Sequence, residues 1–385
     1  MRITVVRGVV VGLALCLGLA AAVFGCGKRS EPGRQFAYVA NASDGSVSML
    51  QVERSTGALK YLGVMQTGKL PSSAAVDRSG RFLFVPNEKS NDVTVFSINQ
   101  KTGLLSQMQT VALASAWGPS AVLMHPADRF VYILNGKSSN LSAFELGTAS
   151  AFQAELVGSP FNLAGLRGAY KAALDARGHF GYVTSLTEDR VAAFTIDQSS
   201  GAWAPVPGSP YRTGQHPNAI AVHPSGLYAY VVARDGLWAY AVDRETGALS
   251  KVEGSPFPGT GLGTMVNDAL GKYLLSVGSM NAVLVYQVDV ISGVLKPLGG
   301  VSTISKPIFS LAMEPSGRYV YATNLESDQV FAFRLDDKGE LKPVPGSPFA
   351  VIKGARPAAA RPVSGEASYN GDTHGTWIAV TPRYK

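Results

Sequence analysis

The side chains that could carry out acid–base chemistry in this chain lie in three short polar segments. Glu88 belongs to NEKSND, His216 to YRTGQHP and Arg234 to VARDG. A carboxylate or an imidazole transfers protons near neutral pH, and a guanidinium binds a carboxylate or phosphate group. Together these groups would suit hydrolysis of a small anionic substrate, and we predict catalytic roles for all three residues.

Four further residues in segments of the same kind are candidates for binding a ligand. They are Arg167, Lys171, Trp117 and Arg212. The alternative for every one of them is a solvated surface, because charged loop residues are mostly exposed. The chain contains no G-x-S-x-G elbow, no H-E-x-x-H motif, no phosphate-binding glycine loop and no paired carboxylates at calcium-loop spacing. We therefore predict neither a metal nor a cofactor.

A repeated unit of just under fifty residues must position these segments. Its clearest marker is a segment that recurs at intervals of 45 to 50 residues and has aromatic residues two positions apart in six of its seven copies. The seven copies are FAYVAN (36–41), FLFVPN (82–87), FVYILN (130–135), FGYVTS (180–185), YAYVVA (228–233), YLLSVG (273–278) and YVYATN (319–324). A second marker is a glycine turn of the TGAL type that follows each copy, degenerate in one unit. Such a period indicates a repeat architecture.

Each unit contains four short runs in which apolar and polar residues alternate, and this pattern is typical of a four-stranded meander. In one unit the runs are AIAVHP (219–224), LYAYVV (227–232), LWAYAVD (237–243) and LSKVEG (249–254). Repeated four-stranded sheets of this length predict an all-β fold, a seven-bladed β-propeller with antiparallel blades.

The first unit begins on its second strand, so another segment must supply its innermost strand. TWIAVTP (376–382) resembles NAIAVHP (218–224) and would close the ring by joining the N- and C-terminal segments in one blade. RPAAARPVSG (356–365) is a competing copy, and 350–375 would otherwise form an insert loop.

The two faces of such a propeller differ in sequence. On one, the turn face, near-identical turns such as HPSG join first to second strands. On the other, the variable face, lie the polar hairpins and links that hold the candidate residues, so we expect any pocket there, at the mouth of the channel. His223 begins an HPSG turn, and sister units have Asp, Glu or His at its position. These residues accept hydrogen bonds in turns, and we predict that His223 is part of the scaffold.

The N-terminus predicts export. MRITVVR precedes an uncharged apolar run over 8–25, which is typical of a secretory signal peptide. Cys26 follows a sequence that resembles a bacterial lipobox, so we predict that residues 1–25 are removed and Cys26 is lipidated. Ordinary export with a free Cys26 and an uncleaved membrane anchor remain alternatives. Residues 26–34 would be a linker and 35–385 the propeller.

These features predict a bacterial lipoprotein of the cell envelope that is attached to the membrane only through its lipid. The net charge of +7 is scattered, and the chain has no basic–aromatic motif. We expect a monomer that does not bind nucleic acid.

The strands that end in Asn, the TGAL hairpins and the HPSG turns resemble the YVTN-type lactonase family of seven-bladed propellers. The resemblance covers about residues 35–382, and the family includes propeller-type 6-phosphogluconolactonases. It implies hydrolysis of a small anionic lactone by an Arg-His pair at the head of a first strand and a Glu after a second strand. In the best-matching unit these positions hold Asn218, Ala219 and Arg234, whereas Asn87-Glu88 reproduces an Asn-Glu pair in another unit.

Two hypotheses follow from this departure. The first is a lactonase-like hydrolase whose site is relocated to the candidate residues at the channel mouth. The second is a non-catalytic envelope propeller that binds a protein or glycan partner.

Overall fold

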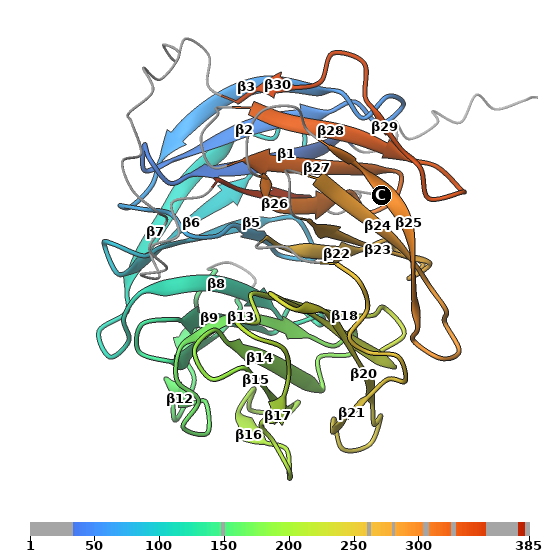
Figure 1. The fold of residues 1–385 in the computed structure, drawn as a ribbon. Coiled ribbons are helices and arrows are strands. Elements are labelled where there is room, and N and C mark those ends of the chain that lie inside the picture. Colours follow the sequence, from blue (N-terminus) through green and yellow to red (C-terminus); the bar gives the residue numbers. More distant parts are fainter. Residues whose placement is uncertain are drawn as a thin grey trace, which may run out of the picture. The chain divides into compact units, whose positions relative to one another are not determined.

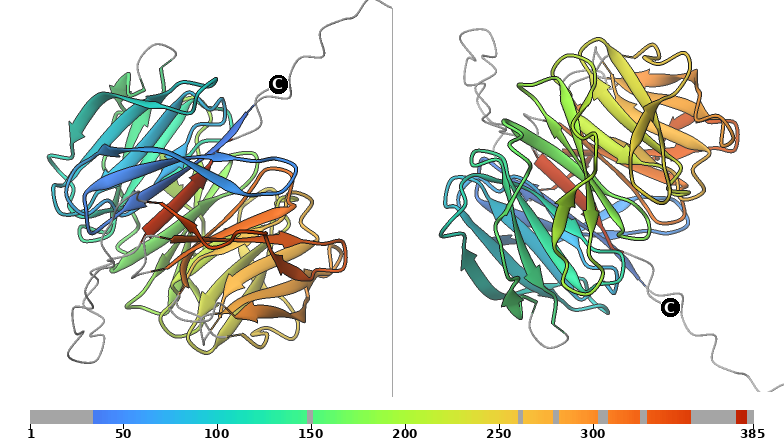
Figure 2. Two further views of the ribbon diagram at one scale, coloured as in Figure 1. Left: turned by 90° about the horizontal axis from the view of Figure 1, so that it is seen from above. Right: turned by 90° about the horizontal axis from the view of Figure 1, so that it is seen from below.

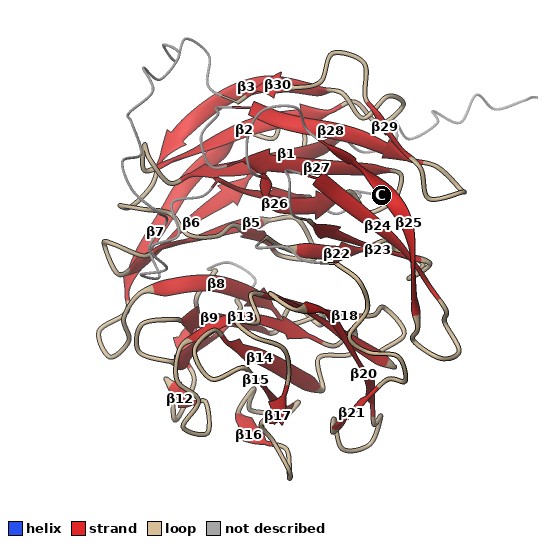
Figure 3. Cartoon of the chain, in the orientation of Figure 1, coloured by secondary structure: helices blue, strands red, loops and turns tan. Residues whose placement is uncertain are grey.

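The computed structural model describes residues 34–147, 151–259, 263–278, 282–302, 308–324, 329–351 and 376–381. Within these ranges all regular structure is β-strand, as Figures 1 and 3 show, and no helix is long and apolar enough to cross a membrane. The strands form seven separate antiparallel sheets, which confirms the predicted seven-bladed propeller. The predicted signal peptide, Cys26, most of the linker and the segment 356–365 lie outside the described residues.

The blades are numbered along the chain, and their strands are given from the innermost outward. Blade 1 consists of β31 (Thr376–Val380), β1 (Gln35–Asn41), β2 (Ser46–Val52) and β3 (Leu59–Gln66). Blade 2 consists of β4 (Ala75–Val76), β5 (Phe82–Asn87), β6 (Asp92–Ile98) and β7 (Leu105–Ala112). Blade 3 consists of β8 (Pro119–Met124), β9 (Phe130–Asn135), β10 (Asn140–Glu145), β11 (Ala154–Glu155) and β12 (Phe161–Asn162).

The remaining blades follow the same plan. Blade 4 consists of β13 (Ala169–Leu174), β14 (Phe180–Ser185), β15 (Arg190–Ile196), β16 (Trp203–Pro205) and β17 (Tyr211–Arg212). Blade 5 consists of β18 (Ala219–Val222), β19 (Tyr228–Ala233), β20 (Gly236–Val242) and β21 (Leu249–Lys251). Blade 6 consists of β22 (Met265–Asn267), β23 (Tyr273–Val277), β24 (Ala282–Val288) and β25 (Leu295–Ser302). Blade 7 consists of β26 (Ile308–Met313), β27 (Tyr319–Asn324), β28 (Gln329–Leu335), β29 (Leu341–Pro343) and β30 (Phe349–Ala350).

The ring closes through the two ends of the chain. β31 pairs antiparallel with β1, and Val39 lies opposite Ile378 in this register. The red C-terminal strand therefore lies against the blue N-terminal strands in both views of Figure 2. The innermost strands contact one another in the order β31, β4, β8, β13, β18, β22 and β26, and β26 contacts β31 again. The predicted closure by N- and C-terminal strands in one blade is confirmed, and of the two candidate segments it is 376–382 that supplies the strand.

A tyrosine in the second strand explains why the aromatic and glycine markers recur together. Tyr132 is fully buried, and its hydroxyl donates to the carbonyl of Gly201 in the TGAL-type hairpin of the next blade, 3.0 Å away. Tyr38, Tyr182, Tyr230 and Tyr321 bond in the same way to Gly103, Gly247, Gly293 and Gly57. The first aromatic of the strand packs on the same glycine, where a Cβ would collide with its ring. Blades 1, 3, 4, 5 and 7 are thus each tied to the next blade at the turn face.

The asparagine that ends a second strand organises the hairpin that follows it. In blade 3, Asn135 Nδ2 donates to Asn140 Oδ1 and to Ser142 Oγ, each 3.0 Å away. Asn41 and Asn87 make equivalent pairs of bonds in blades 1 and 2. Because these bonds fix the hairpin against the third strand, the residue after the asparagine projects from a rigid base.

The turns between first and second strands are held by the residue that begins them. His223 is 2 % exposed, and its Nδ1 accepts the N–H of Ser225 at 3.1 Å. The Nε2 of His223 lies 2.8 Å from the carbonyl oxygen of Gly271 in the next blade, and donates to it. The prediction that His223 belongs to the scaffold is confirmed.

Candidate functional site

The candidate residues lie where hairpins of the variable face meet the links that enter the first strands. The N–H of Glu88 donates to the Leu70 carbonyl at 2.8 Å, and that of Gly136 donates to the Gly118 carbonyl at 2.9 Å. A hairpin side chain adds a second tie, because Asn91 Oδ1 accepts the N–H of Gly118 at 3.0 Å. The polar loops of neighbouring elements are therefore bonded to one another rather than independent.

A buried carboxylate forms the centre of the candidate site. Glu88 is only 6 % exposed, and its Oε1 lies 3.1 Å from the Nζ of Lys137 in the hairpin of blade 3. The Lys137 side chain runs across Gly118, where an added Cβ would lie 2.6 Å from its Cγ. The missing side chain at Gly118 is thus what gives the lysine its path to Glu88.

Lys171 is the third member of this group. It lies on β13, the innermost strand of blade 4, and its Nζ is 4.8 Å from the centroid of the Tyr170 ring. Burial lowers the pKa of Lys171 to about 7, and the negative charge of Glu88 acts in the opposite direction. Glu88, Lys137 and Lys171 are called the Glu88 cluster below. It holds one carboxylate, one cation and one amine that ionises near neutral pH.

The register of β13 shows which position of the first strand Lys171 occupies, and residue spacing alone does not reveal this position. Lys171 pairs with Thr184, the fifth residue of its second strand, and Ala219 pairs with Val232, which is also the fifth. A register shift between Ala169 and Lys171 displaces the count by one residue. Lys171 therefore occupies in blade 4 the place at which the family resemblance expects a histidine in blade 5.

His216 and Arg234 lie in blade 5, so blades 3 and 4 separate them from Glu88 around the ring. His216 has a left-handed backbone with a φ of 50°, and its N–H donates to Asp189 Oδ1 at 2.8 Å. Arg234 is exposed, and its N–H donates to the carbonyl of Gln215 at 2.8 Å. The structure thus brings Glu88 of blade 2 and Lys171 of blade 4 together. His216 and Arg234, the other predicted catalytic residues besides Glu88, lie in blade 5.

The other predicted ligand-binding residues lie in the links that lead into the first strands of blades 3, 4 and 5. Trp117 is 65 % exposed, and its N–H donates to Ser138 Oγ at 3.0 Å in the hairpin that also contains Lys137. Arg167 is exposed in the link before β13, and Arg212 is exposed on β17. Trp117 is thus bonded to the hairpin that supplies Lys137 to the Glu88 cluster.

Lys137 is a site residue that was not predicted from the sequence. It belongs to the polar hairpin NGKSSN, and a lysine there has the same pattern whether it faces solvent or pairs with a buried acid. The signal that could have found it is Gly118, whose repeat position in blade 2 is the leucine of GKLPSS. Across the described parts of the chain, no group of three His, Cys, Asp or Glu side chains is arranged to hold a metal ion.

One expectation needs correction. A pocket of about 200 Å³ lies on the turn face, between the turns of blades 4 and 5, whereas we expected any pocket on the variable face. It is lined by Asp175, Ala176, Arg177, His179, Phe180, Pro224, Ser225, Gly226 and Arg244. The expectation overlooked that similar turns differ in single residues, and these differences leave space at this boundary.

Comparison with known proteins gives this geometry a context. The model of a family described as "Lactonase, 7-bladed beta-propeller" matches residues 29–117 and 105–235, more than half of the chain. The 6-phosphogluconolactonase of Erwinia tasmaniensis is 23% identical over 322 residues, which cover 81% of this chain and 94% of that protein.

Other relatives are matched over shorter stretches. The 6-phosphogluconolactonase of Formosa agariphila is 35% identical over 81 residues, 20% of this chain and 23% of that protein. This chain thus spans less than a quarter of that relative in the alignment. Among solved structures, the periplasmic gluconolactonase of Pseudomonas aeruginosa superposes with a TM-score of 0.68 at 20% identity, over 82% of this chain and 97% of that one. This likeness shows a shared fold.

Proposed function

The chain belongs to the lactonase family of seven-bladed β-propellers, and we propose that it hydrolyses a small anionic lactone at the Glu88 cluster, at the mouth of the channel. The observation that carries the proposal is the position of Lys171 beside the buried Glu88 carboxylate, where burial lowers the pKa of the lysine to about 7. A group that ionises near the working pH is suited to general acid–base catalysis. Relatives named 6-phosphogluconolactonase support a lactone as the substrate.

Each member of the cluster has a distinct part in this mechanism. The neutral amine of Lys171 takes a proton from a water molecule, and the oxygen of that water attacks the lactone carbonyl carbon. The bond between this carbon and the ring oxygen then breaks, and the ring alkoxide takes the proton back from the Lys171 ammonium. Lys137 binds the carboxylate or phosphate of the substrate, because 57% of its side chain is exposed while Glu88 holds its Nζ at 3.1 Å. The product is the open-chain hydroxy acid.

The test is hydrolysis of a panel of lactones by the purified protein. The panel contains 6-phosphogluconolactone, gluconolactone and the uncharged γ-butyrolactone. We expect Lys171→Met to lower kcat/KM by a factor on the order of 10² or more, the usual size of a general-base contribution. Lys137→Ala should raise KM for the anionic lactone and leave the uncharged one unaffected.

Lys89→Ala is the matched control, because Lys89 is an exposed lysine of the same hairpin as Glu88. Its kcat/KM should stay within about twofold of the parent, as for a surface substitution away from the chemistry. No turnover of any lactone, or full activity of Lys171→Met, would refute the proposal.

Trp117 favours a second candidate function. An indole that is 65 % exposed beside the cluster offers a flat stacking surface for a sugar ring or a protein side chain. Asn218, Ala219 and Arg234 stand where the family resemblance expects catalytic groups. A non-catalytic propeller would bind a glycan or an envelope protein through Trp117, lose that binding in Trp117→Ala, and hydrolyse no lactone.

The proposal extends to the location of the protein. The basic start, the uncharged run 8–25 and Cys26 support export and lipidation at Cys26, with attachment in the cell envelope. Cells fed an alkyne-labelled fatty acid should label the parent protein but not Cys26→Ser, which should leave the membrane fraction. Labelling of Cys26→Ser would refute the lipid site.

A further inference from the structure

The turns between first and second strands share one backbone conformation but differ at one residue. Their fourth residue has φ between 51° and 76°, a left-handed region that favours glycine. Along the described turns this residue is Gly80, Asp128, Gly178, Gly226, Gly271 or Gly317. Asp128 is therefore the member of the set that carries a charge.

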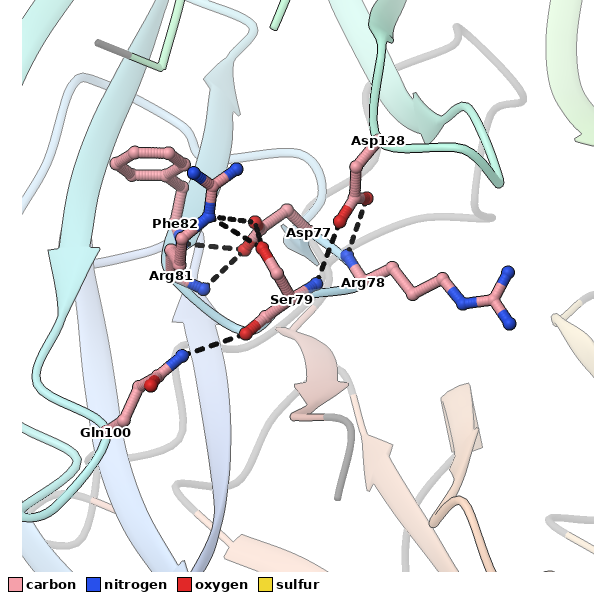
Figure 4. A network of polar contacts seen from close by, with 7 residues as sticks. All are labelled: Asp77, Arg78, Ser79, Arg81, Phe82, Gln100 and Asp128. Carbon is pink, nitrogen blue, oxygen red and sulfur yellow. Dashed lines mark hydrogen bonds and ion pairs between the residues drawn. The ribbon is translucent and has the colours of Figure 1, made fainter. Parts of the chain in front are cut away.

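The Asp128 carboxylate shows what such a turn can bind. In Figure 4 it reaches from blade 3 to the turn of blade 2, where it accepts the N–H groups of Arg78 and Ser79, each at 2.9 Å. Consecutive backbone N–H groups that point to one oxygen pair form an anion-binding concavity. The turn of blade 2 is thus an anion site that the neighbouring blade fills with its own side chain.

The boundary between blades 4 and 5 has the same turns without that side chain. Ala176 and Arg177 correspond to Arg78 and Ser79, and Gly226 takes the place of Asp128. A Cβ added at Gly226 would meet nothing within 4 Å, and the pocket of about 200 Å³ lies at this point.

Two sister boundaries leave no comparable room beside the corresponding glycine. A Cβ at Gly178 would collide with the ring of His125, and one at Gly271 would collide with the ring of His223. The open space beside Gly226 is therefore a property of this boundary and not of the turn itself.

Basic side chains surround the open space. Arg177, His179 and Arg244 are exposed and line the pocket. None of these three side chains forms an ion pair with a carboxylate of the described residues. The one acid in the lining, Asp175, is 5% exposed and its carboxylate accepts the N–H groups of Phe180 at 2.8 Å and Arg177 at 3.1 Å. The Asp175 carboxylate is thus already hydrogen-bonded to N–H groups of its own turn and of the strand that follows it.

We propose that this pocket binds the carboxylate or phosphate group of a small organic anion. The Ala176 N–H stands where the Arg78 N–H holds the Asp128 carboxylate, and the three basic side chains supply the counter-charge. The Arg177 N–H is bonded to Asp175, so Arg177 contributes through its guanidinium. Phe180 and Pro224 form an apolar wall for the rest of the ligand. A volume of about 200 Å³ is many times the roughly 10 to 15 Å³ that a cavity needs to hold one water molecule.

The experiment measures anion binding to the intact protein at constant ionic strength. Inorganic phosphate is followed by ³¹P line broadening and acetate by saturation-transfer NMR, so that the two arms distinguish a phosphate site from a carboxylate site. We expect saturable binding of at least one probe. The double substitution Arg177→Ala/Arg244→Ala should weaken it at least tenfold, and Gly226→Asp should abolish it, because the new carboxylate fills the space as Asp128 does in blade 2.

Arg78→Ala is the matched control, because it removes an exposed arginine beside the turn that Asp128 already fills, and it should leave binding unchanged. If Gly226→Asp fails to fold, judged by its circular dichroism, the double arginine variant decides. Absence of saturable binding refutes the site. Binding that survives the loss of both arginines refutes it too, as does binding that is lost in Lys171→Met instead.

Discussion

Lys171 is the member of the Glu88 cluster whose pKa lies near neutral pH, and its position costs stability. A cationic amine placed among protein atoms loses hydration, and for this reason its pKa falls to about 7 from the ordinary 10.5. Ionisable groups with shifted pKa values are common at functional sites, and they often lower the stability of the folded protein. Two predictions belong to this scale.

Replacing Lys171 with methionine should stabilise the protein, and the gain should depend on pH. Between pH 7 and 10.5 the unfolded chain holds a proton on Lys171 that the folded chain lacks, so the parent becomes more stable as the pH rises through this window. The gain from Lys171→Met should be about 1 to 3 kcal/mol at pH 6 and smaller at pH 9; partial exposure keeps it below the full effect of the shift. Urea unfolding at the two pH values measures it, and a gain of equal size at both would contradict the argument.

The charge of Glu88 should set the pH at which activity rises. Because the Glu88 carboxylate raises the pKa of Lys171, its removal in Glu88→Gln should lower that pKa further. The rising limb of the kcat/KM profile, expected near pH 7 in the parent, should then move to lower pH. Lys89→Ala should leave the limb in place, and an unmoved limb in Glu88→Gln would show that Lys171 does not control it.

At the scale of elements, the repeat made the blades predictable from the sequence. Aromatic residues two apart and a glycine hairpin recur because Tyr132 and its sisters bond to a hairpin glycine in the next blade. Both partners therefore recur in most units, although blade 2 has Phe84 and blade 6 has Leu275 at the tyrosine position. The candidate site was less predictable, since Lys137 shows no pattern of its own and the register shift before Lys171 cannot be counted from residue spacing. Contacts between blades join residues that no local pattern relates.

The bond between the Asp128 carboxylate and the turn of blade 2 is a contact of this kind, and it should contribute to stability. Asp128→Gly removes two charge-assisted hydrogen bonds and leaves a backbone that glycine adopts easily. We expect a loss of about 1 to 3 kcal/mol in the free energy of unfolding. Denaturant titration measures the loss, and Arg78→Ala, which keeps the Arg78 N–H, should cost less than half as much. Equal losses would show that the arginine side chain, and not the carboxylate, joins the blades.

For the molecule as a whole, the closing strand is the element on which the ring depends. Ile378 is 7% exposed on β31 and packs in the core between blades 1 and 7. Ile378→Ala should destabilise the protein by about 2 to 4 kcal/mol, as is usual when a buried isoleucine is truncated. Val380→Ala on the same strand should cost less, because Val380 is only partly buried. Thermal unfolding compares the two, and a smaller effect at Ile378 would argue against closure through this strand.

The pairing of β1 with β31 also has a consequence for how the protein is made. The first strand of the propeller to be synthesised must wait for the last, since Asn41 pairs with Thr376 and Ala37 with Val380. During synthesis the nascent chain carries β1 with one unpaired edge, however many blades have already formed behind it. Any product that stops before residue 376 keeps that edge open. A quality-control protease or chaperone that recognises free strand edges would thus distinguish a chain that stops before residue 376 from the finished one.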